Sequence, residues 1–110
     1  MAGTHDIELG LSTIKSLVQE THEDVLVPVF DKSKNDGHGD RLDRDHWIRQ
    51  RTPVDLVIVE GWMLGYRPVS SQVLSEHMIE VNDNLKKYKQ WDDLYDAAII
   101  AGVESPDIVY

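Results

Sequence analysis

The first residues that could do chemistry stand at the end of an apolar run over residues 56–59. Glu60 and Gly61 follow that run, and in a parallel sheet ligands bind beyond the carboxyl ends of the strands. A carboxylate there can hold magnesium directly or through water, and a glycine leaves space beside the backbone. An ordinary acid at the end of a strand gives the same pattern, so the pattern alone favours neither interpretation.

A second candidate is the polar segment that follows the first short apolar run. It opens with Asp31-Lys32-Ser33 and continues with Gly-His-Gly-Asp-Arg over 37–41. Lys32 and Arg41 offer positive charge and donors for a carboxylate or phosphate, and arginine offers a planar fork. The glycines allow the backbone to fold closely around a ligand. A solvated, mobile loop has a similar composition, and composition alone favours that interpretation.

A third candidate is Gly3-Thr4-His5-Asp6, at the start of a predicted helix. Backbone amides and the positive end of the helix dipole favour an anion at such a place. His5 and Asp6 could instead simply cap the helix, and without further context capping is the favoured interpretation.

The sequence gives little support for a calcium site, a zinc site, or a catalytic serine or cysteine. An EF-hand register beginning at Asp31 fails because Asp36 and Leu42 stand where a calcium loop requires glycine and glutamate. The histidines show no His-x-x-x-His spacing, and no Gly-x-Ser-x-Gly motif is present. The chain has no cysteine, which excludes disulfides, cysteine-ligated zinc and thiol catalysis.

The composition fits one small domain or part of a larger one, with 110 residues, 41% of them hydrophobic, and a formal net charge of −9. Nucleic acids and anionic membranes need a basic face, so we expect neither as a partner. No apolar run approaches the roughly 18 residues of a membrane span, and the first residues do not resemble a signal peptide. We therefore expect a cytoplasmic protein.

Two helices must position these candidate residues. Apolar residues at spacings of three and four predict helices over 7–20 and 70–95. The inward side chains are expected to be Ile7, Leu11, Ile14 and Val18 in the first helix, and Leu74, Met78, Val81, Leu85 and Tyr88 in the second. Ser105-Pro106 predicts the opening of a further helix.

Strands alternate with these helices. The two later apolar runs are typical of strands buried on both faces, as in a parallel sheet. We therefore predict an α/β fold with a mostly parallel sheet of about three strands, few enough to indicate part of a larger domain. The strands are predicted at 25–30, 55–61 and 97–101, with a long loop over 31–53.

Several motifs occur in one order along the chain. They are Gly-Thr-His-Asp at 3–6, Asp-Lys-Ser at 31–33, Gly-x-Gly-Asp-Arg at 37–41, Glu-Gly-Trp-Met-Leu-Gly at 60–65, and Asn-x-Asn-Leu-x-x-Tyr-x-x-Trp-Asp at 82–92. Together they resemble the D-glycerate 3-kinase family, within the phosphoribulokinase and uridine kinase class of P-loop kinases. The resemblance covers nearly the whole chain and implies a partial three-layer P-loop kinase fold.

The resemblance also implies a reaction, the transfer of the γ-phosphate of ATP to a hydroxyl of a small acceptor such as D-glycerate. It implies that Glu60 is the catalytic acid near Mg²⁺ and that Gly61 lies on the cofactor side. Phosphoryl transfer needs mainly positioning and neutralisation of charge, which cationic side chains beside an anionic acceptor provide. The residues implied on the acceptor side are Thr4, His5, Asp6, Asp31, Lys32, Ser33 and Arg41.

One departure from the family limits this expectation. The family carries a P-loop, Gly-x-x-x-x-Gly-Lys followed by Ser or Thr, whereas none of the seven glycines here precedes a lysine. Scattered side chains cannot replace the consecutive amides that cradle a phosphate. We therefore interpret 1–110 as a single partial domain, the middle of a kinase domain cut at both ends. We expect this chain alone to bind neither ATP nor Mg²⁺.

Two functions remain open from the sequence. The first is a fragment of a small-molecule kinase that is inactive alone. The second is a non-catalytic binding module derived from a truncated kinase, which forms a homo-oligomer through exposed sheet edges. A Gly-Lys-Ser or Gly-Lys-Thr loop encoded before Gly3 would favour the first.

Overall fold

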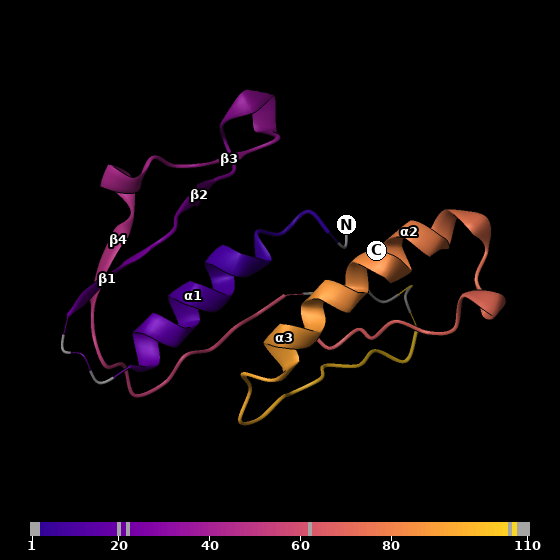
Figure 1. Ribbon diagram of the computed structural model, residues 1–110. Helices are drawn as coiled ribbons and strands as arrows, with labels where there is room; N and C mark the ends of the chain where they lie inside the picture. The colour runs from indigo at the N-terminus through magenta and orange to yellow at the C-terminus, as the bar shows by residue number, and fades with distance from the viewer. Residues whose placement is uncertain (1–2, 20, 22, 62, 106, 108–110) are drawn as a thin grey trace.

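The computed structural model of the protein describes residues 3–19, 21, 23–61, 63–105 and 107. Figure 1 shows an arm of short strands rising beside α1 and a helical part on the other side of that helix. The elements of the described residues are α1 (Ile7–Val18), β1 (Asp24–Val27), β2 (Phe30–Asp31), η1 (Asn35–Gly37), β3 (Asp40–Arg41), η2 (Arg44–His46), β4 (Ile48–Arg51), η3 (Ser71–Val73), α2 (Glu76–Leu85), η4 (Lys86–Tyr88) and α3 (Lys89–Asp92).

The helix α1 buries the predicted side up to its last turn. Ile7 and Leu11 lie in the core, with exposed fractions of 8% and 4%. The prediction for Val18 is wrong, because this side chain is exposed and Leu17 is buried instead. The backbone N–H of Val54 donates to the carbonyl of Leu17, so the returning chain lies against this end of the helix.

The arm replaces the long loop predicted over 31–53. β1 pairs with β4 and β2 pairs with β3, both in antiparallel register, so the segment is a hairpin. The register places Val27 opposite Ile48 and Phe30 opposite Arg41. The loop prediction was wrong because β2 and β3 are too short and too polar to show an alternating pattern.

Left-handed backbone conformations turn the chain at the tip of the arm. Asn35 and Asp36 have φ angles of 53° and 55°, and Gly37 and Gly39 have φ angles of 87° and 79°. Glycine adopts such angles without strain, and Asn and Asp tolerate them better than most residues. The Asn-Asp-Gly-x-Gly sequence was therefore the available signal for a hairpin.

The predicted parallel sheet is not observed. Neither 55–61 nor 97–101 contains a strand among its described residues, and both sheets of the described structure are antiparallel pairs. An extended run becomes a strand only when a neighbour satisfies its backbone groups. The exposed fractions are 73% for Leu56, 82% for Ile58, 98% for Ile99 and 89% for Ile100. The structure thus confirms a mixed α/β composition but neither a parallel sheet nor a P-loop fold.

The core forms where α1 packs against the later helices. Gly10 permits close contact, because a Cβ at this position would lie 2.3 Å from an indole carbon of Trp91. The buried side chains of this core are Ile7, Leu11, Met63, Leu85 and Tyr88, with Val81, Trp91 and Leu94 packed against them.

The helix predicted over 70–95 is shorter and interrupted. It consists of α2, η4 and α3, and it buries Leu85 and Tyr88 as predicted. The prediction for Met78 is wrong, since its side chain is 44% exposed. The helix expected at Ser105-Pro106 is not assessed, because Pro106 and residues 108–110 lie outside the described residues.

A buried amide fixes the chain that precedes α2. The Asn82 side chain accepts a hydrogen bond from the backbone N–H of Val69 at 2.8 Å and donates one to the Val69 carbonyl at 3.0 Å. Asn82 is 6% exposed, so water cannot easily replace these bonds. This pair holds the irregular segment before the helix against the helix itself.

We predict that Asn82→Ala lowers the free energy of unfolding by about 1–3 kcal/mol, because it leaves both backbone groups of Val69 without partners. Urea unfolding monitored by circular dichroism measures the loss. Asp83→Ala on the same helix is the control, since it breaks only an exposed ion pair with Lys86 and should change stability by under about 0.5 kcal/mol. Equal losses in both variants would contradict the prediction.

Candidate functional site

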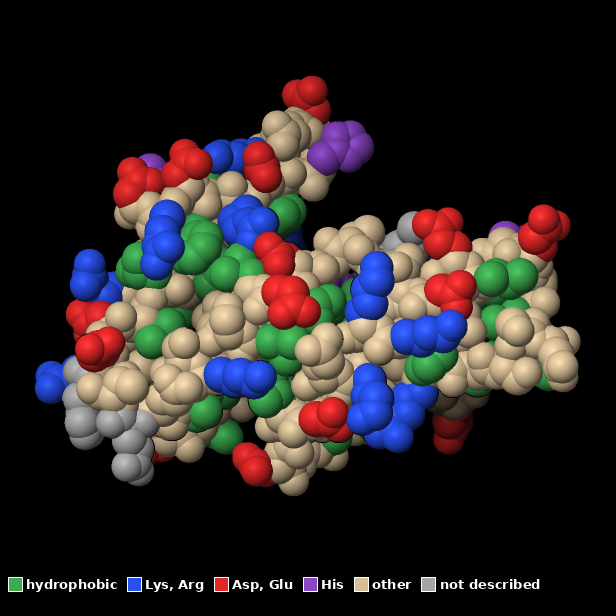
Figure 2. Space-filling view, viewed as in Figure 1, with side chains coloured by type: hydrophobic (Ala, Val, Ile, Leu, Met, Phe, Trp, Pro, Cys, Tyr) green, Lys and Arg blue, Asp and Glu red, His purple; other side chains and the backbone are tan. Residues whose placement is uncertain are grey.

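A cavity of about 480 Å³ lies where the arm, the start of α1 and the helical part meet. The space-filling view shows the notch between the arm and the helical part, with apolar side chains exposed between charged ones below the arm (Figure 2). Four segments far apart in the sequence line the cavity. They contribute Thr4, His5, Asp6, Leu9 and Gly10; Pro28, Val29, Phe30, Asp40 and Arg41; Val59, Glu60, Gly61, Met63 and Leu64; and Tyr88 and Trp91.

Six of the predicted site residues come together in this cavity. They are Thr4, His5, Asp6, Arg41, Glu60 and Gly61. Asp31, Lys32 and Ser33 are not among its lining residues. The Asp31 carboxylate is instead engaged within its own turn, where it accepts hydrogen bonds from the Ser33 amide at 2.9 Å and the Ser33 hydroxyl at 2.6 Å. Those bonds lower the pKa of Asp31, and the binding role predicted for these three residues stays a prediction.

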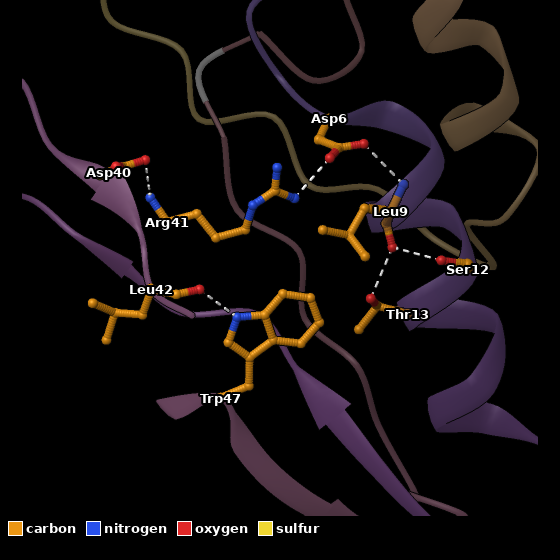
Figure 3. A network of polar contacts seen from close by, with 8 residues as sticks. All are labelled: Asp6, Leu9, Ser12, Thr13, Asp40, Arg41, Leu42 and Trp47. Atoms are coloured by element: carbon orange, nitrogen blue, oxygen red, sulfur yellow. Dashed lines mark hydrogen bonds and ion pairs between the residues drawn. The ribbon is translucent and has the colours of Figure 1, made fainter. Parts of the chain in front are cut away.

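Asp6 joins the arm to α1 (Figure 3). Its Oδ2 accepts a hydrogen bond from Nη1 of Arg41 at 2.7 Å, and its Oδ1 accepts one from the backbone N–H of Leu9 at 3.1 Å. The second bond caps the helix, as one of the two interpretations of this residue predicted. The Arg41 bond, followed by the Leu9 bond, lowers the pKa of the Asp6 carboxyl.

The arm is braced on either side of Arg41. The Trp47 indole N–H donates to the Leu42 carbonyl at 2.7 Å, which ties η2 to the end of β3 (Figure 3). On the other side, a Cβ at Gly39 would lie 2.3 Å from the Phe30 ring, so only glycine allows the ring to cover the backbone there. These contacts set the position from which Arg41 reaches the cavity.

Tyr88 is a site residue that the sequence pattern assigned only to packing. Its ring is buried, yet its hydroxyl lies 2.6 Å from Nδ1 of His5 and accepts a hydrogen bond from the Gly3 amide at 3.2 Å. The Asn-x-Asn-Leu-x-x-Tyr motif contained this residue, but helical spacing alone does not distinguish a buried phenol from a buried phenyl group. Only the fold shows that Tyr88 reaches the first residues of the chain.

Glu60 lines the cavity with an exposed carboxylate. No group of three His, Cys, Asp or Glu side chains suited to a metal occurs among the described residues. Mg²⁺ commonly takes one or two carboxylates and completes its shell with water and substrate phosphates. Glu60 therefore fits a single ligand to a metal that arrives with a phosphate, and the described residues do not form a closed metal site of their own.

The other residues considered from the sequence take structural positions. His46 contacts Asp45, and His77 is exposed on α2. Met63 belongs to the core, whereas Leu64 lines the cavity. Trp62 and His22 lie outside the described residues.

Comparison with known proteins points to kinases. No family model matches the chain. The chain is 36% identical to the chloroplastic D-glycerate 3-kinase of Arabidopsis thaliana over 115 aligned positions. The alignment covers 99% of this chain and 25% of that protein. The chain is 40% identical over 76 positions to the uncharacterized kinase mug58 of Schizosaccharomyces pombe, covering 68% of this chain and 27% of the relative.

Two further relatives agree. The probable ATP-dependent kinase TDA10 of Saccharomyces cerevisiae is 36% identical over 97 positions, which cover 80% of this chain and 33% of the relative. The solved structure of YGR205w protein superposes with a TM-score of 0.69 at 31% identity, over 86% of this chain and 35% of that one. The chain is therefore homologous to the kinases related to D-glycerate 3-kinase, and it spans about a quarter to a third of the length of the curated relatives it matches.

Proposed function

We propose that this chain forms the acceptor-binding part of a small-molecule kinase that transfers the γ-phosphate of ATP to a hydroxyl of a small acid, D-glycerate or a close analogue. The observation that carries the proposal is the convergence of Thr4–Asp6, Arg41 and Glu60 on one cavity. The name of the Arabidopsis relative supports the choice of acceptor.

The charges of the cavity suit a small hydroxy acid. The Arg41 guanidinium has five N–H donors in a planar fork, and Asp6 takes a bond from Nη1 alone. The fork can therefore bind an acceptor carboxylate while Asp6 holds it in place. The carboxylate of Glu60 and the imidazole of His5 provide polar partners for hydroxyl groups. A volume of about 480 Å³ is ample for a three-carbon acid.

Apart from Glu60, the phosphoryl donor would be held by groups other than those that line the cavity. Mg²⁺ with ATP would supply the phosphoryl group and neutralise charge on it, and Glu60 would supply one ligand to that metal. The 110 residues contain no Gly-Lys-Ser or Gly-Lys-Thr loop to cradle the phosphates. We therefore derive no transfer step from these residues and expect this chain alone to show no measurable affinity for ATP.

The acceptor proposal predicts that this chain binds D-glycerate and that Arg41→Ala weakens binding by about tenfold or more, since a charge-assisted bidentate bond is lost. Arg41→Lys should recover only part of the affinity because lysine lacks the fork. Isothermal titration calorimetry measures both effects.

The matched control is Arg49→Ala on the same arm, where the arginine pairs with Asp24 and does not line the cavity. Its affinity should equal that of the unaltered protein. Failure of the unaltered protein to bind D-glycerate, or equal losses in the Arg41 and Arg49 variants, would contradict the proposal. Tight ATP binding would contradict the expectation about the phosphoryl donor.

The link between Asp6 and Arg41 also predicts a pH dependence. The pKa of Asp6 is lowered in the folded protein, so the ion pair stabilises the fold above the unfolded pKa and this stability is lost as pH falls through the folded pKa. Asp6→Asn keeps the capping oxygen but removes the charge. Urea midpoints should therefore differ most between protein and variant at neutral pH and converge below about pH 4. A difference that is constant with pH would refute the role of this charge.

A second candidate function is self-association. The runs at 55–60 and 97–101 carry exposed β-branched and aliphatic side chains, which is uncommon over contiguous stretches of a monomer surface. Extended runs of this composition can pair with another chain through their backbone groups. The net charge of −9 opposes such pairing, so salt should favour it.

This candidate predicts a molar mass above that of the 12.6 kDa monomer at high protein concentration. The double variant Ile58→Asp with Ile100→Asp should restore the monomer, because charge in the contact opposes burial. Light scattering coupled to size-exclusion chromatography measures the mass at low and high salt. Ile79→Asp, an exposed site on α2, is the control. A monomeric parent protein at high concentration would eliminate the candidate.

A further inference from the structure

The hydroxyl of Tyr88 lies beneath the short segment that opens α1. Tyr88 ends η4 and is 3% exposed. Its oxygen accepts a hydrogen bond from the Gly3 N–H at 3.2 Å and lies 2.6 Å from His5 Nδ1. The two rings meet edge to face, with centroids 5.7 Å apart and planes at 82°. A residue 83 positions away in the sequence therefore orients the imidazole.

The need to pair the buried phenolic proton favours one form of that imidazole. A phenolic hydroxyl has one proton to donate and two lone pairs that accept. The Gly3 amide can only donate, so it occupies a lone pair of the Tyr88 oxygen. The second lone pair could accept a proton from His5 Nδ1, but the phenolic proton, on a residue that is 3% exposed, would then have no acceptor among the described residues. Because an unpaired buried donor is costly, we infer that His5 Nδ1 accepts the phenolic proton. Neutral His5 consequently carries its own proton on Nε2.

The segment that carries His5 is held at both ends. Gly3 has a φ angle of 95°, and a Cβ there would lie 2.5 Å from the Asn84 side chain, so the backbone rests directly on α2. At the other end Asp6 caps α1 and binds Arg41. With the backbone anchored on either side, the hydrogen bond to Tyr88 fixes the remaining freedom of the ring.

We propose that Tyr88 is a positioning residue, which holds His5 as an Nε2–H donor at the wall of the cavity so that it binds an oxygen of the acidic acceptor. The identity of the ligand rests on the proposed function, whereas the form of the imidazole does not. His5 lines the cavity, and its Nδ1 is engaged by Tyr88, so Nε2 is the ring nitrogen left for a ligand. Tyr88 itself acts through His5.

The test uses the complete chain labelled with ¹⁵N at histidine. Two-bond ¹H–¹⁵N NMR spectra at about pH 8, where histidine is neutral, report which ring nitrogen carries the proton. We expect His5 to show a protonated Nε2, and Tyr88→Phe to show a mixture of both forms. Calorimetry should show D-glycerate binding weakened about tenfold in Tyr88→Phe, the scale of one lost buried hydrogen bond.

Tyr95→Phe is the matched control, because the Tyr95 hydroxyl is buried with no hydrogen-bond partner among the described residues. It should alter neither the His5 spectrum nor the affinity. His5→Gln, which places an amide donor near the Nε2 position, should bind better than His5→Asn, which places it near Nδ1. This pair keeps the inference testable if Tyr88→Phe fails to fold.

Each outcome decides a separate point. His5 protonated on Nδ1 in the unaltered protein, or an unchanged spectrum in Tyr88→Phe, would overturn the inference. Unchanged D-glycerate affinity in Tyr88→Phe would overturn its role in binding. A protein that shows the expected His5 spectrum but does not bind D-glycerate would refute the proposed function and leave the positioning of His5 supported.

Discussion

The packing of α1 against Leu85, Tyr88 and Trp91 is the interaction on which the rest of the molecule depends. It is the contact that joins the start of the chain to the helical part, and it is close because Gly10 presents no side chain to the indole. Each wall of the cavity is attached to this contact. The arm reaches it through Asp6, and the Glu60 segment reaches it through Met63.

The single carboxylate of Asp6 contacts two parts of the structure at once. It satisfies a free amide at the start of α1, and it fixes the guanidinium of Arg41 on the arm. An exposed ion pair of this kind contributes little to stability. Its value lies in geometry, since it fixes a cation beside the start of α1 at the wall of the same cavity.

The apolar runs at 55–61 and 97–101 were predicted to be strands of a parallel sheet, and neither contains a strand among its described residues. Their composition is that of strands buried on both faces, but a strand is defined by hydrogen bonds to a neighbour, and composition cannot supply one. Within the described residues these runs have no such neighbour, and their side chains face solvent. The relatives are three to four times as long as the region that this chain matches.

The sequence by itself indicated the two helical regions, capping by Asp6 as one of two interpretations, and six of the predicted site residues that line the cavity, because local spacing and motifs depend on residues close together in the chain. It did not determine the arm, since the pairing of β2 with β3 depends on backbone bonds between short polar segments. Nor did it determine the role of Tyr88. A buried phenol becomes a positioning group only when folding brings Gly3 and His5 to its hydroxyl, and that contact spans more than 80 residues.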